Sequence, residues 1–402
     1  MRSPLANPGA KPQRLALARD LVRSLRRGHP WVFRDALKRP PSGAPGDIAE
    51  LSDKRGKVVA RGYVDTSSAL SFRACTAAPR EALDDAWAHG RFKAAWDLRE
   101  MIRASGETTG YRLFAGEGDS LPGLVCDLYG STAVIRLDGP AAEGFWCAEG
   151  VADWLQTHGG ITTAYQRLRT RGEPEGRLLC GPLPDGPVPF VENGLHFTAD
   201  IQRGQKTGFF LDQRDNRARV GALCRDRTVL NMFGYTGGFS VYAAAGGATH
   251  VTTVDVARPA LEATAHHMAL NQIPTARHEE SPADAFEFLA ESAREKRRWD
   301  VVILDPPAFA PNQKSIPQAT SAYQRLIGAG AAVTQENGWL VAASCSSHIG
   351  MEAFVTICQD GVGQARKTAR VVGSWHQAMD HPWPLAFPDF RYLKAILMRI
   401  EP

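Results

Sequence analysis

From about residue 192 onward, the sequence alternates short, continuous apolar runs with longer stretches that have helical spacing. Four of these runs are TVLNMF, HVTTVDV, DVVILD and WLVAAS. A run of strand length without polar alternation is typical of a strand buried on both faces, and such strands belong to parallel sheets covered by helices on both sides. The pattern therefore predicts a doubly wound, parallel α/β domain over residues 192–402.

The N-terminal half has a different pattern. The stretch RLALARDLVRSLRRGHP indicates a strand and a short helix, and GDIAELSDKRGKVVARGYVDTSSALSFRACT alternates apolar and polar residues between turn signals. Residues 1–80 are therefore predicted to form a small, β-rich domain.

Residues 81–191 are predicted to form a helical connector followed by a central α+β domain. EALDDAWAHGRFKAAWDLREMIRAS has helical spacing, FWCAEGVADWLQTHGG indicates a second helix, and LPGLVCDLYG, STAVIRLDG and ITTAYQRL indicate strands. The segment RTRGEPEGRLLCGPLPDGPVP is rich in Gly and Pro and predicts a loop or the edge of a sheet.

Composition favours a globular protein without a membrane span. Hydrophobic residues make up 44% and charged residues 22% of the 402 residues, and there is no apolar run of about 18 residues. The first twenty residues lack the apolar core of a secretory signal, so we expect a cytoplasmic protein. The seven cysteines are scattered, without paired metal-ligand spacing, so we expect neither disulfides nor a metal site.

The net charge of +4 is unevenly distributed. The first 45 residues contain ten Lys or Arg and two acids, Asp20 and Asp35. Such a patch can neutralise the phosphates of a nucleic acid. A solvated tail and helix face explains the same charges equally well.

Two features of the predicted parallel sheet indicate a nucleoside cofactor. The run NMFGYTGGFSVYAAAGGA leads from a strand through Gly234, Gly237 and Gly238 into a helix, and such a turn lets a ligand approach the backbone. Asp255 ends the next strand, where an acid can bind ribose hydroxyls. Asp284, at a third strand end, either accepts from an adenine amine or only caps a helix.

The sequence DVVILDPPAFA ends the fourth strand with Asp305, Pro306 and Pro307. Two prolines make this loop rigid, and it can hold a planar base against backbone carbonyls and an aromatic ring such as Phe309. The alternative is a purely structural role, in which the two prolines only stiffen the end of the strand.

Cys345 follows the fifth strand in the sequence SCSSH. A residue at the carboxyl end of such a strand faces the ligand crevice. A single cysteine is more often a small buried hydrophobe, but a filler of that kind would lie within the strand rather than among Ser344, Ser346 and His348. We therefore interpret Cys345 as a nucleophile.

These motifs resemble the bacterial family of large-subunit ribosomal RNA 5-methylcytosine methyltransferases, which join an N-terminal PUA domain, a central α+β domain and a C-terminal, Rossmann-like class I methyltransferase domain. The resemblance covers nearly the whole chain. It depends on the segments RRGHPWVFRDAL, GEGDSLPGLVCDLYG, GQKTGFFLDQRDNR, NMFGYTGGFS, LDPPAFA, SCSSH, DHPW and RYLK. Gly234 departs from the family pattern, in which a cysteine is common.

The resemblance implies S-adenosylmethionine as the cofactor and RNA as the partner, either 23S rRNA or a large-subunit assembly intermediate. A homodimer is left open. The implied cofactor-binding residues are Lys206, Thr207, Phe210, Asp212, Asn231, Phe233, Tyr235, Thr236, Gly237, Asp255, Asp284 and Asp305. The implied substrate-binding residues are Arg214, Pro306, Pro307, Phe309 and His348, and the implied catalytic residues are Cys345 and Asp305.

The chemistry explains why a cysteine is needed. Carbon 5 of cytosine is a poor nucleophile, and addition of the Cys345 thiolate to carbon 6 makes it an enamine that can attack an electrophilic methyl group. Asp305 can hold the ring nitrogen and the amino edge. The base that removes the carbon 5 proton is not evident from the sequence.

Three other functions are compatible with parts of the sequence. A guanine or adenine N-methyltransferase would share KTGFFLDQR and the DPP loop but would need no cysteine. A 5-methyluridine enzyme would be expected to have its cysteine in an SCNP-like context, and a non-catalytic RNA-binding assembly factor would not need Asp255, Asp305 and Cys345 together.

Overall fold

The computed structural model describes residues 1–168, 176–310 and 312–401. The chain folds into two compact units, and it passes between them more than once. The first unit contains residues 1–194, 198–211 and 380–390, and the second contains residues 195–197, 212–379 and 391–402. The Gly- and Pro-rich segment, residues 169–189, lies partly outside the described residues. Its described part contains β10 (Gly176–Cys180), an edge strand, which agrees with the predicted loop or sheet edge.

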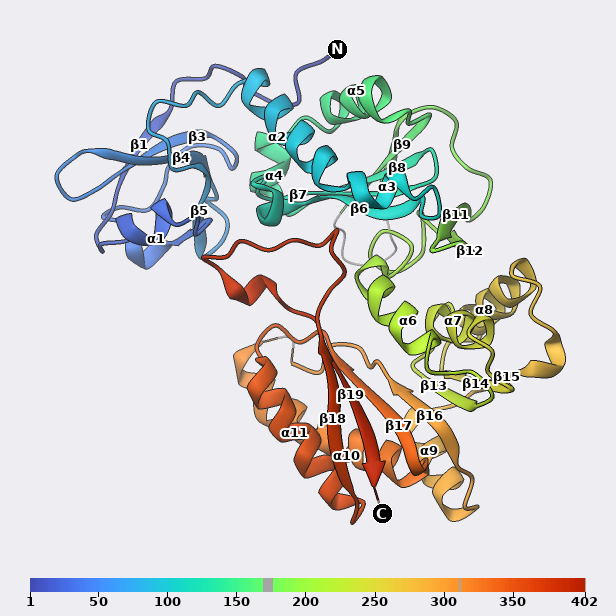
Figure 1. The fold of residues 1–402 in the computed structure, drawn as a ribbon. Coiled ribbons are helices and arrows are strands. Elements are labelled where there is room, and N and C mark those ends of the chain that lie inside the picture. Colours follow the sequence, from blue (N-terminus) through green and yellow to red (C-terminus); the bar gives the residue numbers. More distant parts are fainter. Residues whose placement is uncertain (169–175, 311, 402) are drawn as a thin grey trace. The chain divides into compact units, whose positions relative to one another are not determined.

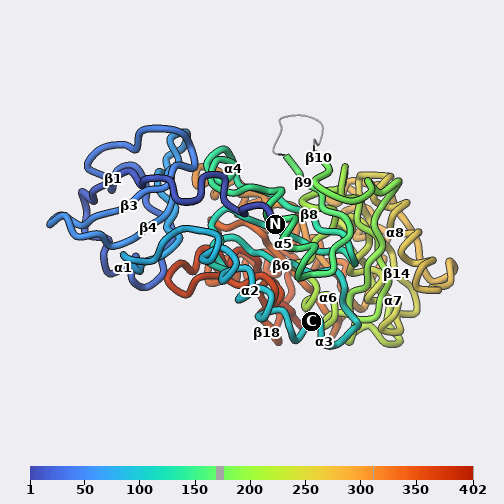
Figure 2. The backbone as a smooth tube through the Cα atoms, turned by 90° about the horizontal axis from the view of Figure 1, so that it is seen from above, coloured from blue at the N-terminus to red at the C-terminus, as the bar shows by residue number. Residues whose placement is uncertain are grey.

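The first sheet of the first unit has the strand order β1-β3-β4-β5-β2. β1 is parallel to β3 and the other pairs are antiparallel. Its elements are β1 (Gln13–Ala16), α1 (Val22–Arg26), β2 (Trp31–Phe33), β3 (Ile48–Ser52), β4 (Val58–Val64) and β5 (Leu70–Thr76). Figure 2 shows β1, β3, β4 and α1 together at one end of the view. The strand and short helix expected before residue 30 are confirmed.

The second sheet has the order β10-β9-β8-β7-β6, in which only β8 and β9 are parallel. The predicted helices and strands of this region are present, and β6 is an additional strand. The elements are α2 (Asp85–Leu98), α3 (Glu100–Ala104), β6 (Gly110–Ala115), β7 (Leu124–Tyr129), β8 (Thr132–Leu137), α4 (Pro140–Phe145), α5 (Ala148–Gly159) and β9 (Thr163–Arg167). Two short strands follow, β11 (Val188–Glu192) and β12 (Leu195–Ala199).

Helix α2 is more than the connector that its sequence predicted. Its Phe92 is fully buried, stacks on Phe114 of β6 at 4.9 Å between ring centroids and contacts Trp154 of α5. Apolar residues from both sheets, including Tyr63 of β4, belong to the same core. The helix is therefore part of the hydrophobic centre of the first unit.

Polar contacts also join the two sheets of the first unit. Arg73 of β5 forms a buried ion pair with Glu117 at 2.9 Å, and Trp31 of β2 donates its indole N–H to the same carboxylate. The Tyr63 hydroxyl donates to the Pro122 carbonyl at 2.8 Å. A buried carboxylate needs such partners, because an unpaired charge in the interior is costly.

The second unit is built on a seven-stranded sheet with the order β15-β14-β13-β16-β17-β19-β18 (Figure 1). The strands are β13 (Thr228–Met232), β14 (His250–Asp255), β15 (His278–Pro282), β16 (Trp299–Leu304), β17 (Thr334–Ser344), β18 (Thr368–Trp375) and β19 (Lys394–Glu401). The five strands from β15 to β17 are parallel. The α/β fold class is thus confirmed, but an all-parallel sheet is wrong, because β19 runs antiparallel to both β17 and β18.

Both faces of the parallel strands are covered. Along β16, Val302 and Leu304 belong to a core shared with α9, α10 and α11, whereas Val301 and Ile303, also buried, point to the opposite face. Helix α7 contacts β13 and β14, and α8 contacts β14 and β15. The helices are α6 (Arg214–Gly221), α7 (Gly238–Ala245), α8 (Arg258–Leu270), α9 (Ala285–Arg294), α10 (Ile316–Val333) and α11 (Met351–Gln364).

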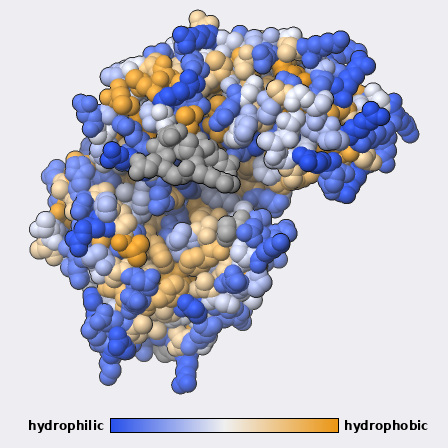
Figure 3. Space-filling view, turned by 180° about the vertical axis from the view of Figure 1, so that it is seen from behind, coloured by the Kyte–Doolittle hydropathy of each residue, from blue (hydrophilic) through white to orange (hydrophobic). Residues whose placement is uncertain are grey.

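Charged and polar side chains cover much of the face seen in Figure 3, and apolar patches are scattered among them. Among the described residues, no helix is both long and apolar enough to cross a membrane.

Candidate active site

The strand order of the second unit defines where a ligand can bind. β13 lies between β14 and β16, so the chain leaves it toward opposite sides of the sheet. Open α/β sheets bind ligands at the carboxyl ends of the strands beside such a reversal. The turn after β13, Asp255 at the end of β14, Asp305 after β16 and Cys345 after β17 all lie at this edge of the sheet.

The Gly-rich turn after β13 has an unusual backbone. Phe233, Tyr235 and Gly237 have φ angles of 57°, 46° and 77°, and side chains are disfavoured at such angles. Gly237 also lacks space, because a Cβ atom there would lie 2.3 Å from Cγ2 of Thr264. The backbone of this turn is therefore held tightly against α8.

Asp255 holds the same turn from the other side. Its carboxylate accepts from the backbone N–H groups of Tyr235 and Ala257, each at 2.9 Å. On α8, Thr264 donates to the Tyr235 carbonyl at 3.1 Å, and His267 lies 2.8 Å from the Thr236 carbonyl. The structure thus brings Tyr235, Thr236, Gly237 and Asp255 together, as the sequence predicted.

A buried chain of hydrogen bonds runs beneath the turn. Asn231 donates to Ser240 at 2.8 Å, Ser240 lies 2.7 Å from Thr253, and Thr253 lies 2.8 Å from Nε2 of His278. Burial is the main cause that lowers the pKa of His278 to about 4, and nearby His250 lowers it further. His278 is therefore neutral at pH 7 and links β13, α7, β14 and β15.

Asp284 acts as the cap of α9. It is exposed, and its carboxylate accepts from the N–H groups of Phe286 and Glu287 at 2.9 and 3.1 Å. The cap that the sequence offered as one alternative is therefore present.

The loop after β16 meets the segment that contains Cys345. The Ala310 N–H donates to the Ser346 hydroxyl at 3.2 Å, and the Phe309 ring lies 4.7 Å from the ring of Tyr323. The Tyr323 hydroxyl in turn bonds to Ser344 and Ser346 at 3.0 and 3.1 Å, on both sides of the cysteine. Tyr323 of α10, which sequence reasoning missed, thus holds the two predicted motifs together.

The side chains of these two motifs differ in accessibility. Pro306 is buried, Asp305, Phe309 and Cys345 are half-buried, and Pro307 and His348 are exposed. Cys345 is the first residue after β17. The predicted nucleophile therefore lies at the edge of the sheet rather than inside the strand.

Lys394 lies beside Cys345 and was not singled out from the sequence. It pairs with Ser344 in the antiparallel register of β17 and β19, and only 2% of it is exposed. Its ammonium donates to the carbonyls of Ser346 and Tyr392 at 2.6 and 2.8 Å. Burial lowers its pKa to about 8, and Cys345 opposes that shift.

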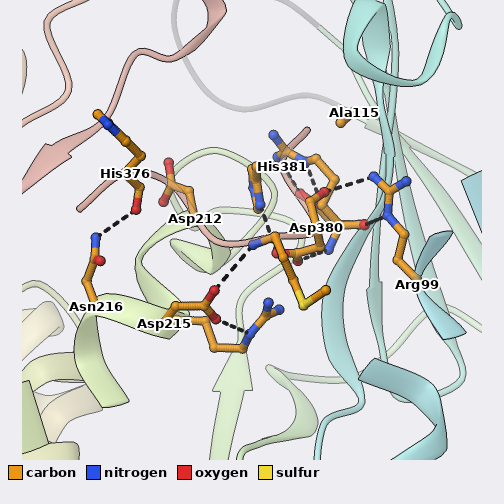
Figure 4. Close-up of polar contacts among 12 residues, drawn as sticks. Arg99, Ala115, Asp212, Asp215, Asn216, His376, Asp380 and His381 are labelled. Atoms are coloured by element: carbon orange, nitrogen blue, oxygen red, sulfur yellow. Dashed lines mark hydrogen bonds and ion pairs between the residues drawn. The ribbon is translucent and has the colours of Figure 1, made fainter. Parts of the chain in front are cut away.

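Asp212 and Arg214 belong to a segment held by the C-terminal part of the second unit. Tyr392 donates to Asp212 at 2.6 Å, and Arg214 forms an ion pair with Asp215 at 3.1 Å. Figure 4 shows Asn216 donating to the His376 carbonyl, at 3.1 Å. Tyr392 and Asn216 were also missed, although both lie in motifs that the sequence analysis quoted.

Three predicted cofactor residues belong to the first unit. The buried Thr207 hydroxyl donates to Asp127 at 2.5 Å and lies 3.1 Å from the Tyr129 hydroxyl. The Lys206 ammonium lies 4.3 Å from the ring centroid of Phe210.

The fold and the residues at the carboxyl edge of the sheet define a class I methyltransferase, and comparisons with known proteins agree. Residues 152–399 match the model of the S-adenosylmethionine-dependent methyltransferase family, and residues 15–76 match a PUA-like domain. The chain therefore belongs to the S-adenosylmethionine-dependent methyltransferase family.

Several relatives are similar over nearly their whole length. A protein of Deinococcus radiodurans named ribosomal RNA large subunit methyltransferase is 36% identical over 96% of this chain and 97% of its own. Proteins of Alteromonas mediterranea and Escherichia coli named ribosomal RNA large subunit methyltransferase I are 34% and 32% identical, covering 94% and 96% of this chain and 96% and 99% of theirs. The chain belongs to the same family as these relatives.

Solved structures show the same fold. A methyltransferase crystallised with S-adenosylhomocysteine has a TM-score of 0.85 and 24% identity, covering 96% of this chain and all of the other. An S-adenosylmethionine-dependent methyltransferase of Streptococcus mutans has a TM-score of 0.84, with the same identity and coverage.

The residues of the second unit fit S-adenosylmethionine. The buried side-chain oxygen of Asn231 has no hydrogen-bond partner among the described residues, so it can accept from a bound ligand. The adjacent turn lies at the edge of the sheet where Asp255 supplies a carboxylate. The dependence on this cofactor that the sequence predicted is confirmed by the family match.

Proposed function

We propose that the chain methylates carbon 5 of a cytosine in large-subunit ribosomal RNA and that Cys345 forms a covalent bond to the base. The observation that carries this proposal is the position of Cys345, half-buried directly after β17 and beside the loop that follows β16. The names of the relatives support large-subunit ribosomal RNA as the substrate.

Four of the other cysteines have surroundings that favour an unreactive thiol. Cys75, Cys126, Cys224 and Cys358 are buried, and burial raises the pKa of each thiol. A thiol with a raised pKa is a poor nucleophile at neutral pH, because only the thiolate reacts. Cys345 has better access to a substrate than these four.

The proposed reaction begins when the Cys345 thiolate adds to carbon 6 of the cytosine. The electron pair of the carbon 5–carbon 6 double bond then becomes available at carbon 5, which forms a new bond to a methyl group. Bound S-adenosylmethionine would supply that methyl group as an electrophile: its sulfur–methyl bond would break as the carbon–methyl bond forms, and S-adenosylhomocysteine would leave. Loss of the carbon 5 proton to a base re-forms the double bond and expels Cys345 as a thiolate, so the enzyme is regenerated.

We assign the remaining roles by position. Asp305 would hold the ring nitrogen and amino group of the base, and Pro306, Pro307, Phe309, Arg214 and His348 would bind RNA. Asp255 would bind the ribose of the cofactor and Asp284 its adenine, through a carboxylate that also caps α9. Asp212, Asn231 and the turn residues Phe233, Tyr235, Thr236 and Gly237 would complete the cofactor site of the second unit. The resemblance assigns Lys206, Thr207 and Phe210 to cofactor binding as well.

The domain limits follow the same proposal. Residues 1–80 would form the RNA-binding PUA-like domain, residues 81–191 the central domain and residues 192–402 the catalytic domain. The PUA-like match over residues 15–76 supports the first of these.

Replacement of Cys345 by serine tests the function. Serine is nearly isosteric, but its hydroxyl supplies almost no anion at neutral pH, so activity should fall by several orders of magnitude while cofactor affinity is kept. Cys180→Ser is the matched control, because Cys180 is also half-buried but lies on the edge strand β10. Methyl transfer to ribosomal RNA is followed by mass spectrometry of nucleosides, which also identifies the product.

A second experiment traps the covalent bond. RNA with 5-fluorocytosine at the target should be methylated and then remain attached to Cys345, because fluorine replaces the proton whose loss releases the cysteine. Retention of most activity by Cys345→Ser, or an adduct on another cysteine, would refute the mechanism. A methylated guanine or adenine, or 5-methyluridine, would refute the cytosine assignment, and the absence of any methyl transfer would favour a non-catalytic assembly factor.

A further inference from the structure

Lys394 is a buried cation next to the proposed nucleophile. It lies on β19 directly opposite Ser344, the residue before Cys345, and 2% of it is exposed. Two carbonyl oxygens, those of Ser346 and Tyr392, accept from its ammonium at 2.6 and 2.8 Å. These bonds fix the ammonium at the end of β17.

Among the described residues, the ammonium has no carboxylate partner. Among the residues that the structure describes, none forms an ion pair with Lys394, although a buried charge is usually paired. The two carbonyl groups satisfy two of the three N–H donors of the ammonium but do not neutralise its charge. The ionisable group that favours the charged form of Lys394 is Cys345.

We propose that the Lys394 ammonium is the charge partner of the Cys345 thiolate and keeps this thiol deprotonated before RNA binds. The proposal deepens the proposed function, on which it rests. Lys394 acts here as a positioning residue. The proton leaves the Cys345 sulfur for solvent, and no bond to Lys394 is formed or broken.

The other titratable groups near the end of β17 do not replace Lys394. Burial raises the pKa of Tyr323, so its hydroxyl is neutral over the working pH range, and Asp305 carries the wrong sign to stabilise a thiolate. His348 is exposed. Burial lowers the pKa of His376, the hydrogen bond to the Leu393 carbonyl opposes that shift, and Arg391 and Lys394 add to it, so the neutral ring is favoured.

The pKa of Lys394 itself is compatible with this role. At about 8, most of the ammonium remains charged at pH 7. An ammonium close to a thiol lowers the thiol pKa because it favours the anion. The same Coulomb interaction favours both charged forms. The thiolate should therefore raise the pKa of Lys394 as the ammonium lowers the pKa of Cys345.

The rate of alkylation by iodoacetamide measures the thiolate fraction of Cys345 without RNA or cofactor. Peptide mass spectrometry assigns the labelled residue, and the rate is followed from about pH 6 to 10. In the wild type, the midpoint should lie below the ordinary thiol value of about 8.5. An ordinary or raised midpoint in the wild type overturns the proposal without any substitution.

Lys394→Gln removes the charge but keeps N–H donors for the two carbonyls. In this variant, the midpoint of the pH dependence of Cys345 alkylation should rise by about one pH unit or more. Such a rise lowers the labelling rate at pH 7 about tenfold. Lys394→Arg retains a cation and should restore most of the rate. Lys367→Gln is the matched control, because Lys367 donates to the Thr334 carbonyl at 2.8 Å, at the opposite end of β17, and should leave the rate unchanged.

The outcomes separate the two proposals. An unchanged midpoint in a folded Lys394→Gln variant refutes the role of Lys394 and leaves the covalent mechanism standing. If Lys394→Gln does not fold, the wild-type titration and Lys394→Arg still decide. Full methylation activity in Cys345→Ser would refute the covalent mechanism, whatever the labelling shows.

Discussion

A single carboxylate, that of Asp255, fixes a turn and has the proposed role of binding the cofactor ribose. It fixes the turn after β13 through two backbone N–H groups, and it lies where a ribose hydroxyl is expected. The bonds to the backbone determine where the carboxylate points, so the acceptor is in place before the cofactor binds. Such preorganisation reduces the entropy lost on binding.

Asp255→Ala should weaken binding of S-adenosylmethionine. Loss of hydrogen bonds to a charged acceptor costs about 1.5 to 3 kcal/mol, which calorimetry would detect as a lower affinity. Asp300→Ala is the control, because Asp300 also accepts from a backbone N–H group, that of Thr228 at 2.9 Å, but lies at the opposite edge of the sheet. Equal affinity in the Asp255 variant and the wild type would remove the ribose assignment.

At the scale of elements, His278 connects the edge strand β15 to the interior of the sheet. Its folded pKa of about 4 lies below the value of about 6.5 for an unfolded chain. The unfolded state therefore binds more protons between these values, and the folded state loses stability as the pH falls from 6.5 toward 4. Thr253, Ser240 and Asn231 depend on the same neutral ring.

His278→Gln should make stability less sensitive to acid. We expect the wild type to lose on the order of 1 to 2 kcal/mol between pH 7.5 and pH 5 through this histidine, measured as the free energy of unfolding in urea. His196→Gln, an exposed histidine of the second unit, should keep the wild-type slope. If the free energy of unfolding of His278→Gln depended on pH as in the wild type, protonation of this ring would not cause the loss of stability in acid.

The elements differed in how well the sequence predicted them. Strands β13, β14, β16 and β17 are continuous apolar runs because both faces are buried. β18 was missed because it is an edge strand with exposed Val371 and Val372. The pairing of β18 with β19 could not be predicted from the sequence either, because a long segment separates the two strands.

The site shows the same division. Asp255 is the last residue of β14, and Asp305 and Cys345 directly follow β16 and β17. These positions alone predicted that the three residues lie at one edge of the sheet. Lys394 and Tyr323 act through contacts made by distant elements, β19 and α10, with the loop after β17. Nothing in the local sequence of a lysine within an apolar strand indicates which carbonyls it will meet.

At the scale of the whole molecule, the basic N-terminal residues should supply affinity for RNA. Deletion of residues 1–80 is a poor test, because it removes Arg73 and Trp31 from the buried Glu117 and Tyr63 from its stack on Phe145. Replacement of exposed side chains avoids this damage.

Arg23, Arg26 and Arg27 are exposed on and beside α1. Their joint replacement by alanine should weaken RNA binding and reduce the salt dependence, since each phosphate contact contributes roughly 0.7 to 0.9 to the slope of log K against log salt. The control replaces Arg294, Lys296 and Arg298, which are also exposed but lie before β16, at the amino end of the sheet. Equal affinities and slopes for the two triple variants would contradict an RNA-binding role.

The way the chain passes between its units constrains the order of assembly during synthesis. Asp380 belongs to the first unit, where its carbonyl accepts from the buried Arg99 (Figure 4). Its carboxylate accepts from the Arg112 backbone N–H. Domains usually mature from the N-terminus as they leave the ribosome. Here the first unit also contains residues that are translated almost last. A chain that ends before residue 380 would therefore lack these hydrogen bonds in its first unit.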